Sequence, residues 1–347
     1  MALTVCSART SFGNGSICVL EFCRSAVARG STILAAATAE CNDMNSTLSR
    51  VDGIVSARPA GRLGFISDFY ELSKPRIITL LLITTAAAMV IAARGIPSLR
   101  VLFCTLLGGA LAAASAGAFN CIVDSDIDGL MRRTCARPIP TGRISINRAA
   151  VYAVVTGGLS FAILILFVNP LAAWLSLVGN IYYVVIYTML LKRATPLNIV
   201  IGGAAGAIPP LVGSAAVTGT ITGQAIGLFA LIFLWTPPHF WSLALMTETD
   251  YARARVPMLP NVSGVARTKT EIVVYSIVLV AASLALYPLH FFGLFYLVAA
   301  VILGAIFIVD AIGTYRNSGT AWPRRLFKYS LLYLALMCAM MVVDRII

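Results

Sequence analysis

Charged residues are scarce in this sequence. Only 12% of its 347 residues are Asp, Glu, Lys or Arg, whereas 59% are hydrophobic and the mean hydropathy is +0.89. A single soluble core cannot bury that much apolar surface. The scarcity of charge therefore excludes a water-soluble globular enzyme and indicates a chain that crosses a membrane several times.

Metal-binding and disulfide motifs are also lacking. The chain has two histidines, His239 and His290, and no two of its eight cysteines form a Cys-x-x-Cys pair. Zinc sites and disulfide frameworks depend on such clusters, so the sequence argues against both. Segments of about ten residues with alternating polarity, typical of membrane β-barrels, are missing as well.

Long apolar runs are abundant instead. A helix needs about 20 mostly apolar residues to cross the hydrocarbon core of a bilayer. We predict an all-α, polytopic membrane protein whose roughly nine transmembrane helices enclose a central intramembrane cavity. The predicted spans are residues 77–93, 99–121, 147–168, 171–190, 197–217, 223–246, 271–288, 291–312 and 327–343.

The basic residues predict the orientation of these spans. Fifteen Lys and Arg residues lie in or beside the loops after the second, fourth, sixth and eighth spans, whereas the odd loops carry only Arg94 and Arg100. Positive loops stay on the cytoplasmic side, so the even loops should lie there together. The net charge of +12 then reflects topology, and nucleic-acid binding is not needed to explain it.

Acidic residues are concentrated in the loops after the second and sixth spans. The first of these loops begins NCIVDSDIDGLMRRT, at residues 120–134. A calcium loop would place its acidic ligands as DSDIDG does, but its twelfth position, where a bidentate Glu belongs, is Cys135. A calcium loop is therefore disfavoured.

A helical continuation of the second span explains the spacing better. Asn120, Asp124 and Asp128 would then share one face, with Asp126 pointing away. Oxygen ligands alone suit a hard ion such as Mg²⁺, and Arg133 and Arg137 follow as donors to an anion. Metal beside guanidinium fits a diphosphate site. The alternative is a solvated helix end whose Asp and Arg side chains pair only with each other.

Two further clusters are predicted to face the same side. Asp250 follows the sixth span in the loop that ends with the stiff PMLP turn, and Tyr187, Lys192 and Arg193 end the fourth span. The alternative role for Lys192 and Arg193 is that of simple topology anchors. His239 lies in PPHFW, where two prolines interrupt a helix at membrane depth.

The pattern of Asn120, Asp124, Asp128, Arg133-Thr134, Arg137-Pro138 and Gly142 resembles the first signature of the UbiA superfamily of intramembrane prenyltransferases, which use Mg²⁺ and an isoprenyl diphosphate. Within it, four segments resemble the protoheme IX farnesyltransferase family: SKPRIITLLLITT at 73–85, LKRATPLNI at 191–199, PPHFW at 237–241 and DYARARVPMLP at 250–260. One departure is Ala254, where many members of the superfamily carry a second Asp.

This resemblance implies a reaction and a set of site residues. The substrates would be farnesyl diphosphate and heme b, the product heme O on the route to heme A and the cytochrome oxidase cofactor, and the cofactor Mg²⁺. It implies catalytic roles for Asp124, Asp128, Arg133, Arg137 and Asp250, and metal binding by Asn120, Asp124, Asp128 and Asp250. Substrate binding would fall to Asn120, Tyr187, Lys192, Arg193, His239 and Tyr251. For His239, the alternative to heme contact is a buried histidine bonded within the protein.

Other functions and the surroundings of the chain stay open at this point. A related prenyltransferase would act on a phenolic quinone precursor or a chlorin, whereas an ion-coupled transporter would carry its charges near mid-span. The resemblance implies contact with the lipid bilayer and association with a heme A synthase. We predict a bacterial inner (plasma) membrane, with an organelle inner membrane as the alternative.

The N-terminal part of the chain differs from the rest. We predict a prenyltransferase domain at 66–347 that is preceded by an extension at 1–65, in which four acidic residues accompany six arginines. Three explanations remain for the extension: a disordered segment, a transit peptide, or a start codon assigned too early.

Overall fold

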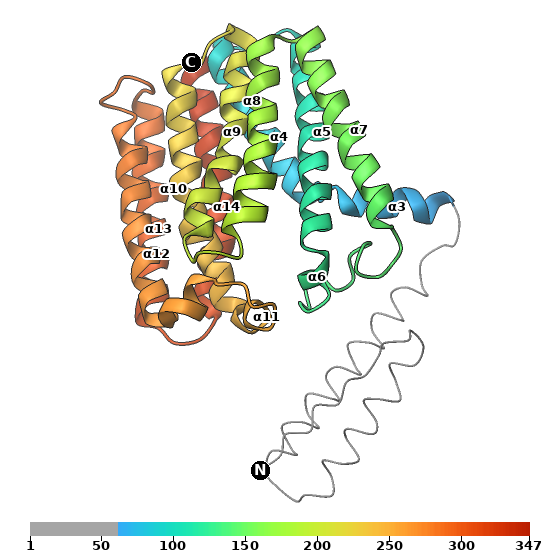
Figure 1. The fold of residues 1–347 in the computed structure, drawn as a ribbon. Coiled ribbons are helices and arrows are strands. Elements are labelled where there is room, and N and C mark those ends of the chain that lie inside the picture. Colours follow the sequence, from blue (N-terminus) through green and yellow to red (C-terminus); the bar gives the residue numbers. More distant parts are fainter. Residues whose placement is uncertain (1–61) are drawn as a thin grey trace, which may run out of the picture. The chain divides into compact units, whose positions relative to one another are not determined.

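The computed structural model describes residues 62–347. The prediction for the extension falls almost wholly outside these residues. Every regular element within 62–347 is helical (Figure 1). The helices are α3 (Arg62–Leu72), α4 (Pro75–Ala93), α5 (Leu99–Val123), α6 (Ser125–Asp128), α7 (Ile146–Phe167), α8 (Pro170–Ile181), the π-helix η1 (Tyr182–Leu191), α9 (Asn198–Thr218), α10 (Gly223–Met246), α11 (Glu248–Arg253), α12 (Leu259–Ala285), α13 (Leu294–Arg316) and α14 (Ala321–Ile346).

Nine helices in the described part are long and apolar enough to cross a membrane, α8 and η1 counting as one span. The predicted all-α, polytopic membrane fold is confirmed. The predicted central cavity stays a prediction. Cavities of about 430 Å³ and 230 Å³ lie beside α13 and α14 and among α5, α7 and α8, respectively.

Two predicted span boundaries are wrong. The seventh helix begins at Leu259, twelve residues before the predicted position 271, with a kink at Gly264, where φ is +81°. The ninth helix begins at Ala321 and not at 327. The first turns of both helices carry basic and polar side chains. Hydropathy identifies only the part of a helix that lies in hydrocarbon, so it does not show where the helix itself begins.

Small residues allow the helices to pack closely, as membrane helices do. Ser115 on α5 donates a hydrogen bond to the Ala153 carbonyl on α7 at 2.8 Å, and Ser160 returns one to the Gly108 carbonyl at 2.7 Å. A Cβ on Gly108 would lie 2.7 Å from Leu164. The α5–α7 pair is therefore held at a distance that larger side chains would not permit.

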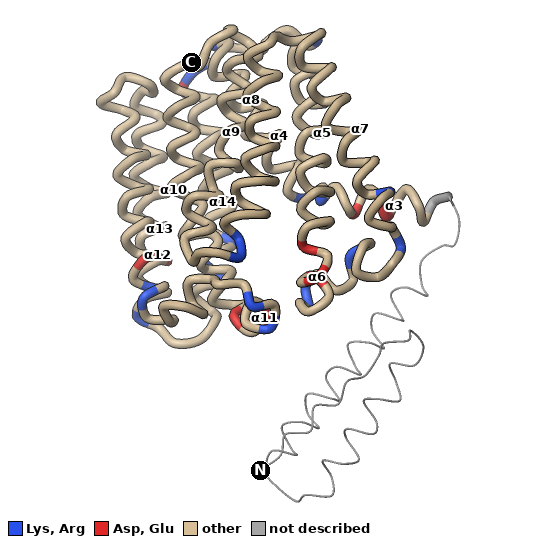
Figure 2. Tube along the Cα trace, in the orientation of Figure 1, with Lys and Arg blue, Asp and Glu red and all other residues tan. Residues whose placement is uncertain are grey.

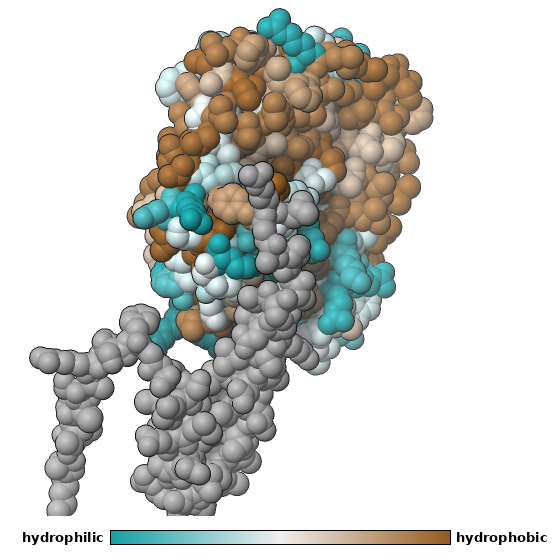
Figure 3. All heavy atoms as spheres, turned by 90° about the vertical axis from the view of Figure 1, so that its right-hand side faces the viewer, coloured by the Kyte–Doolittle hydropathy of each residue, from teal (hydrophilic) through white to brown (hydrophobic). Residues whose placement is uncertain are grey.

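Most charged residues lie toward one end of the bundle (Figure 2). They mark α6, α11, the start of α14 and the loops near them, as the orientation of the spans predicts. Viewed from the side of α7, the remainder of the surface is mostly hydrophobic (Figure 3). Exposed apolar side chains such as Val151, Val154 and Leu166 suit a lipid-facing exterior.

Helix α3 lies across the direction of the spans at this end (Figure 1). Arg143, in the loop between α6 and α7, forms ion pairs with Asp68 and Glu71 on α3 and donates to the Ala136 carbonyl at 2.6 Å. After the end of α3, the chain turns at Ser73 and Lys74 and enters α4. The loop that follows the acidic segment is thereby fixed to the start of the first span.

The shared end of the loops gives a first prediction. Asn147→Cys and Ser263→Cys, at exposed positions near Gly142 and Gly264, should react with a membrane-impermeant thiol reagent from the same side of sealed vesicles. Ser98→Cys, exposed at the opposite end, should react only from the other side. A cysteine-free background removes the native thiols, and labelling of the first two positions from opposite sides would contradict the arrangement.

Candidate active site

The acidic segment forms one buried face where α5 meets α6. The Asp124 amide donates to the Asn120 carbonyl at 2.9 Å, and the Asp128 amide to the Asp124 carbonyl at 2.8 Å, so helical spacing persists across the junction. Asn120, Asp124 and Asp128 are 4%, 0% and 2% exposed. The side chain of Asp126 is 61% exposed. The structure thus agrees with the face that the spacing predicts.

Each buried carboxylate on this face has a cationic partner. Lys192 donates to Asp124 Oδ2 at 2.5 Å, and Arg137 donates to both oxygens of Asp128 at 2.7 and 2.9 Å. The Asn120 amide also donates to Asp124 Oδ2, at 2.8 Å. Asp124 Oδ1 is buried but accepts no hydrogen bond from residues 62–347. One oxygen at the centre of the site is therefore left for a donor or a cation.

Lys74 completes this group, although the sequence did not single it out. It adopts a left-handed conformation, with φ of 58°, at the turn between α3 and α4. A Cβ on Gly117 would lie 3.3 Å from the Ser73 carbonyl, so this turn packs directly on α5. One turn further along α5, the Lys74 ammonium donates to Asn120 Oδ1. The signals in the sequence were a lysine directly before the first span and its place in the segment SKPRIITLLLITT.

The π-helix η1 brings Lys192 and two tyrosines to the site. Thr188 receives a hydrogen bond from the Asn120 amide at 3.2 Å, and it donates to the Tyr183 carbonyl at 2.9 Å. The ring of Tyr187 lies against Gly202 on α9, where a Cβ would come within 2.2 Å of it. The wider turn of a π-helix often occurs at functional sites. Here η1 ends at Leu191, directly before Lys192.

The loop after α10 packs against the acidic segment through a small hydrophobic cluster. Ile127 and Met131 of the first loop join Tyr251, Val256 and Met258 of the second, together with Ile199 on α9. The two loops therefore lie at the same end of the bundle, as the distribution of basic residues predicts. Arg133 lies beside the Tyr251 hydroxyl. Tyr251 follows Asp250, so the cluster carries that carboxylate to the same end of the bundle.

Asp250 differs from the other two buried carboxylates. It is 7% exposed, yet it has no ion pair or side-chain hydrogen bond with any residue that the structure describes. Among the described residues, no three Asp, Glu, His or Cys side chains lie close enough to form a metal site by themselves. A metal held here would need oxygens from a substrate or water as well.

Two predicted substrate-binding residues have other partners. Arg193 binds Asp126 through two hydrogen bonds of 2.6 and 2.7 Å on the exposed side of α6. His239 Nδ1 lies 2.7 Å from the Ser330 hydroxyl on α14, and its ring stacks between Trp235 and Phe327. His239 is therefore buried and hydrogen-bonded within the protein, and its contact with heme stays a prediction.

The ionisable groups of the loops respond to these partners. The hydrogen bonds from Arg193 lower the pKa of Asp126. Burial alone would lower the pKa of Arg137, but the charge and hydrogen bonds of Asp128 raise it above its ordinary value. Burial lowers the pKa of Lys74 and raises that of Tyr251.

Comparison with known proteins identifies the family. The sequence model of the UbiA prenyltransferase family matches residues 81–335, nearly three quarters of the chain. The chain belongs to this family. It is therefore a prenyltransferase of the membrane, and the site just described lies within the matched residues except for Lys74.

Several curated relatives of this UbiA protein are named protoheme IX farnesyltransferase. That of Picosynechococcus sp. is 54% identical over 281 residues, covering 80% of this chain and 89% of the relative. That of Synechocystis sp. is 54% identical over 279 residues, covering 80% and 88%. The likeness spans almost the whole membrane domain.

Solved structures support the same fold at lower identity. A structure of digeranylgeranylglyceryl phosphate synthase matches with a TM-score of 0.69 at 20% identity, covering 81% of this chain and 99% of that one. A UbiA homolog from Archaeoglobus fulgidus, solved with DMAPP and Mg²⁺ bound, matches with a TM-score of 0.57 at 19% identity, covering 80% and 99%.

Proposed function

We propose that this protein transfers the farnesyl group of farnesyl diphosphate to a vinyl group of heme b, giving heme O on the route to heme A. The observation that carries the proposal is a set of buried carboxylates and cations at one end of an apolar bundle. The identity to relatives named protoheme IX farnesyltransferase supports the choice of substrates.

The residues of the site fit a magnesium ion. All the candidate ligands are oxygens, which Mg²⁺ prefers. Asp124 Oδ1 is buried and accepts no hydrogen bond from residues 62–347, and the Asp250 carboxylate forms no ion pair with them. We infer that Asn120, Asp124, Asp128 and Asp250 hold the ion together with oxygens of the diphosphate and of water, because the three aspartates do not lie close enough to one another to hold it alone. Bound there, Mg²⁺ would offset the charge that builds on the departing diphosphate. The Mg²⁺ in the related archaeal structure supports this inference.

The cations of the site bind the diphosphate in this proposal. In the structure Arg137 and Lys192 form ion pairs with Asp128 and Asp124, and Lys74 donates a hydrogen bond to the Asn120 amide oxygen. When the substrate arrives, its phosphate oxygens take over some of these bonds, and Arg133 supplies a further guanidinium from the same loop. Fixed donors aimed at a leaving group stabilise it more in the transition state than in the ground state.

The transfer of the farnesyl group requires no side-chain nucleophile. The bond between farnesyl C1 and oxygen breaks, and its electron pair leaves with the diphosphate. The vinyl π electrons of heme b form the new carbon–carbon bond to C1, and the cation left on the porphyrin side chain takes up water and releases a proton. The apolar helices limit other water in the site, which protects the allylic cation from hydrolysis.

The acceptor and the surroundings complete the proposal. We infer that heme b approaches from the PPHFW segment of α10, with His239 at its edge, while Tyr187, Tyr251 and Arg193 border the diphosphate side. The charged end lies on the cytoplasmic side of a bacterial inner membrane, or on the equivalent side of an organelle inner membrane. A heme A synthase would be the natural recipient of the product.

An assay with purified protein tests the reaction directly. Incubation with Mg²⁺, heme b and farnesyl diphosphate should yield one hydroxyethylfarnesyl heme for each diphosphate released, measured by mass spectrometry and a diphosphate assay. Omitting Mg²⁺ should stop both. Prenylation of a phenolic quinone precursor or a chlorin, with no change in heme, would support the related activity in place of the proposed one.

Lys74 provides a sharper test of the site. Lys74→Gln should raise the KM for farnesyl diphosphate about tenfold, because a charge-assisted hydrogen bond to phosphate is lost. Arg76→Gln, which removes the same charge from an exposed position two residues away, should change KM less than twofold. Equal effects of the two changes would mean that general surface charge, and not Lys74, attracts the substrate.

A further inference from the structure

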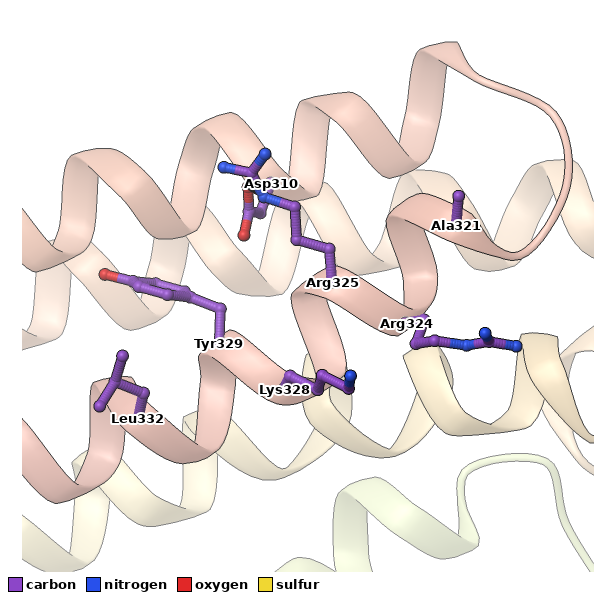
Figure 4. A pocket seen from close by; sticks show the side chains of 7 residues that line it. All are labelled: Asp310, Ala321, Arg324, Arg325, Lys328, Tyr329 and Leu332. Carbon is purple, nitrogen blue, oxygen red and sulfur yellow. Dashed lines mark ion pairs between the residues drawn. The ribbon is translucent and has the colours of Figure 1, made fainter.

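A cavity of about 430 Å³ lies outside the candidate active site, against α13 and α14 (Figure 4). Its lining comprises Asp310 on α13 and, on α14, Ala321, Arg324, Arg325, Lys328, Tyr329 and Leu332. Three of the seven are basic and one is acidic. The proposed prenyl transfer uses none of them.

The walls of this cavity are fixed by contacts within the protein. Arg325 reaches from α14 to place its Nε 2.8 Å from Asp310 Oδ1, and its guanidinium lies 5.1 Å from the centre of the Trp322 ring. Trp322 packs on α13 at Gly313, where a Cβ would come within 2.2 Å of the indole. Tyr329 donates to the Leu303 carbonyl at 2.8 Å. The cavity is thus formed before any ligand arrives.

The charges of the lining are not balanced. Arg324 and Lys328 form no ion pair with another residue in the described part of the chain, so the cavity carries two more positive than negative charges. Asp310 is only 1% exposed, and its Oδ2 receives no hydrogen bond from residues 62–347. A buried carboxylate oxygen without a donor is costly. The cavity therefore calls for an anion that also donates a hydrogen bond.

The position of the cavity suggests where that ligand comes from. Asp310 precedes the end of α13 by six residues, or about 9 Å along the helix axis. Next to the cavity, Val309 is 56% and Leu332 52% exposed, on a bundle whose apolar exterior suits lipid. Tryptophan and basic side chains at helix ends are typical of the boundary between hydrocarbon and headgroups. A ligand here would sit at the depth of lipid headgroups.

We propose that this cavity binds the headgroup of an anionic glycerophospholipid, with its phosphate at Arg324 and Lys328 and a headgroup hydroxyl donating to Asp310. Phosphatidylglycerol has both features, whereas phosphatidylcholine has neither a net charge nor a headgroup hydroxyl. The acyl chains would lie along the exposed apolar side of α14, beside Leu332. The assignment does not depend on the proposed prenyl acceptor.

The fluorescence of Trp322 can measure lipid binding at this cavity directly. Trp174, which is 55% exposed, is replaced by Phe, while Trp235 and Trp241 are buried and can stay. The protein is reconstituted with phosphatidylcholine and phosphatidylglycerol carrying brominated acyl chains, and Trp322 quenching gives their relative binding constants. The preference for phosphatidylglycerol should be about fivefold, the contribution of one basic side chain at a membrane surface. No preference would overturn the proposal.

A matched pair of double variants separates the cavity from general surface charge. Arg324→Gln with Lys328→Gln should abolish the preference. Arg148→Gln with Arg267→Gln, which removes two exposed positive charges from α7 and α12 at the same end, should retain it. Equal loss in both variants would overturn the proposal, because it would leave only the attraction of a basic surface for anionic bilayers.

Two further arms test the hydroxyl and the source of the phosphate. Phosphatidylmethanol, a phosphodiester with the same single negative charge but no headgroup hydroxyl, should bind less tightly than phosphatidylglycerol, and Asp310→Asn should narrow that gap. Soluble glycerol 3-phosphate or heme b at millimolar concentration should not displace the brominated lipid. Displacement by either would assign the cavity to a soluble phosphate or to the propionates of the heme, and would overturn the lipid assignment.

Discussion

Asp124→Asn is expected to lower the rate of prenyl transfer about 1,000-fold, the upper range for removing a group that stabilises charge in a transition state. The substitution keeps the volume of a side chain that is 0% exposed, and an amide can still bond with Asn120 and Lys192. Only the charge next to the unsatisfied Oδ1 is lost. The fold should therefore persist, which the thermal melting of the detergent-solubilised protein would verify.

Asp126→Asn is the matched control for that result. Asp126 is two residues away and bears the same charge, but it pairs with Arg193 on the exposed side of α6. Its loss should change the rate less than threefold, since exposed ion pairs contribute little. Binding of Mn²⁺ in place of Mg²⁺, followed by electron paramagnetic resonance, should weaken only in Asp124→Asn. Equal damage from both changes would rule out a catalytic face made of Asn120, Asp124 and Asp128.

Asp250→Asn is expected to lower the rate about 100-fold and to raise the Mg²⁺ concentration needed for half-maximal activity. Asp250 is buried without an ion pair among the residues described, so its negative charge has no evident structural purpose. A carboxylate in that state is stabilised when a cation binds. Replacing it by Asn should accordingly leave the protein as stable as before, or more so.

Glu248→Gln provides the comparison on the same short helix. Glu248 starts α11, is partly exposed, and carries the same charge two residues from Asp250. The activity and the Mg²⁺ requirement of the Glu248→Gln variant should stay within twofold of those of the original protein. If Asp250→Asn instead lowers the melting temperature and leaves the Mg²⁺ requirement unchanged, Asp250 supports the loop and does not face the metal.

Local spacing explains how much of the site the sequence could predict. Asn120, Asp124 and Asp128 are four residues apart, and helical geometry alone places them on one face. The pairing of Asp128 with Arg137 was also within reach, since both stand in one short segment. The position of Asp250 directly after the sixth span was also visible in the sequence, and the resemblance to the family added farnesyl diphosphate and heme b as the substrates.

Contacts between distant segments explain what the sequence could not predict. Lys74 reaches Asn120 only because the Ser73 carbonyl packs on Gly117, and no local pattern reveals that contact. The bond between His239 and Ser330 joins residues 91 positions apart. By sequence, Arg193 could have contacted phosphate or served only as a topology anchor, and its ion pair with Asp126 depends on how η1 packs beside α6.

The concentration of charge at one end of the bundle (Figure 2) bears on the reversibility of the proposed reaction. Diphosphate would depart into the water that bathes this end, whereas the farnesylated macrocycle would stay dissolved in the bilayer. The two products thus enter different phases as soon as they separate, and they can react backward only by meeting again in the same site. Removal of diphosphate from the water at this end would then prevent the reverse reaction and leave the farnesylated heme in the bilayer.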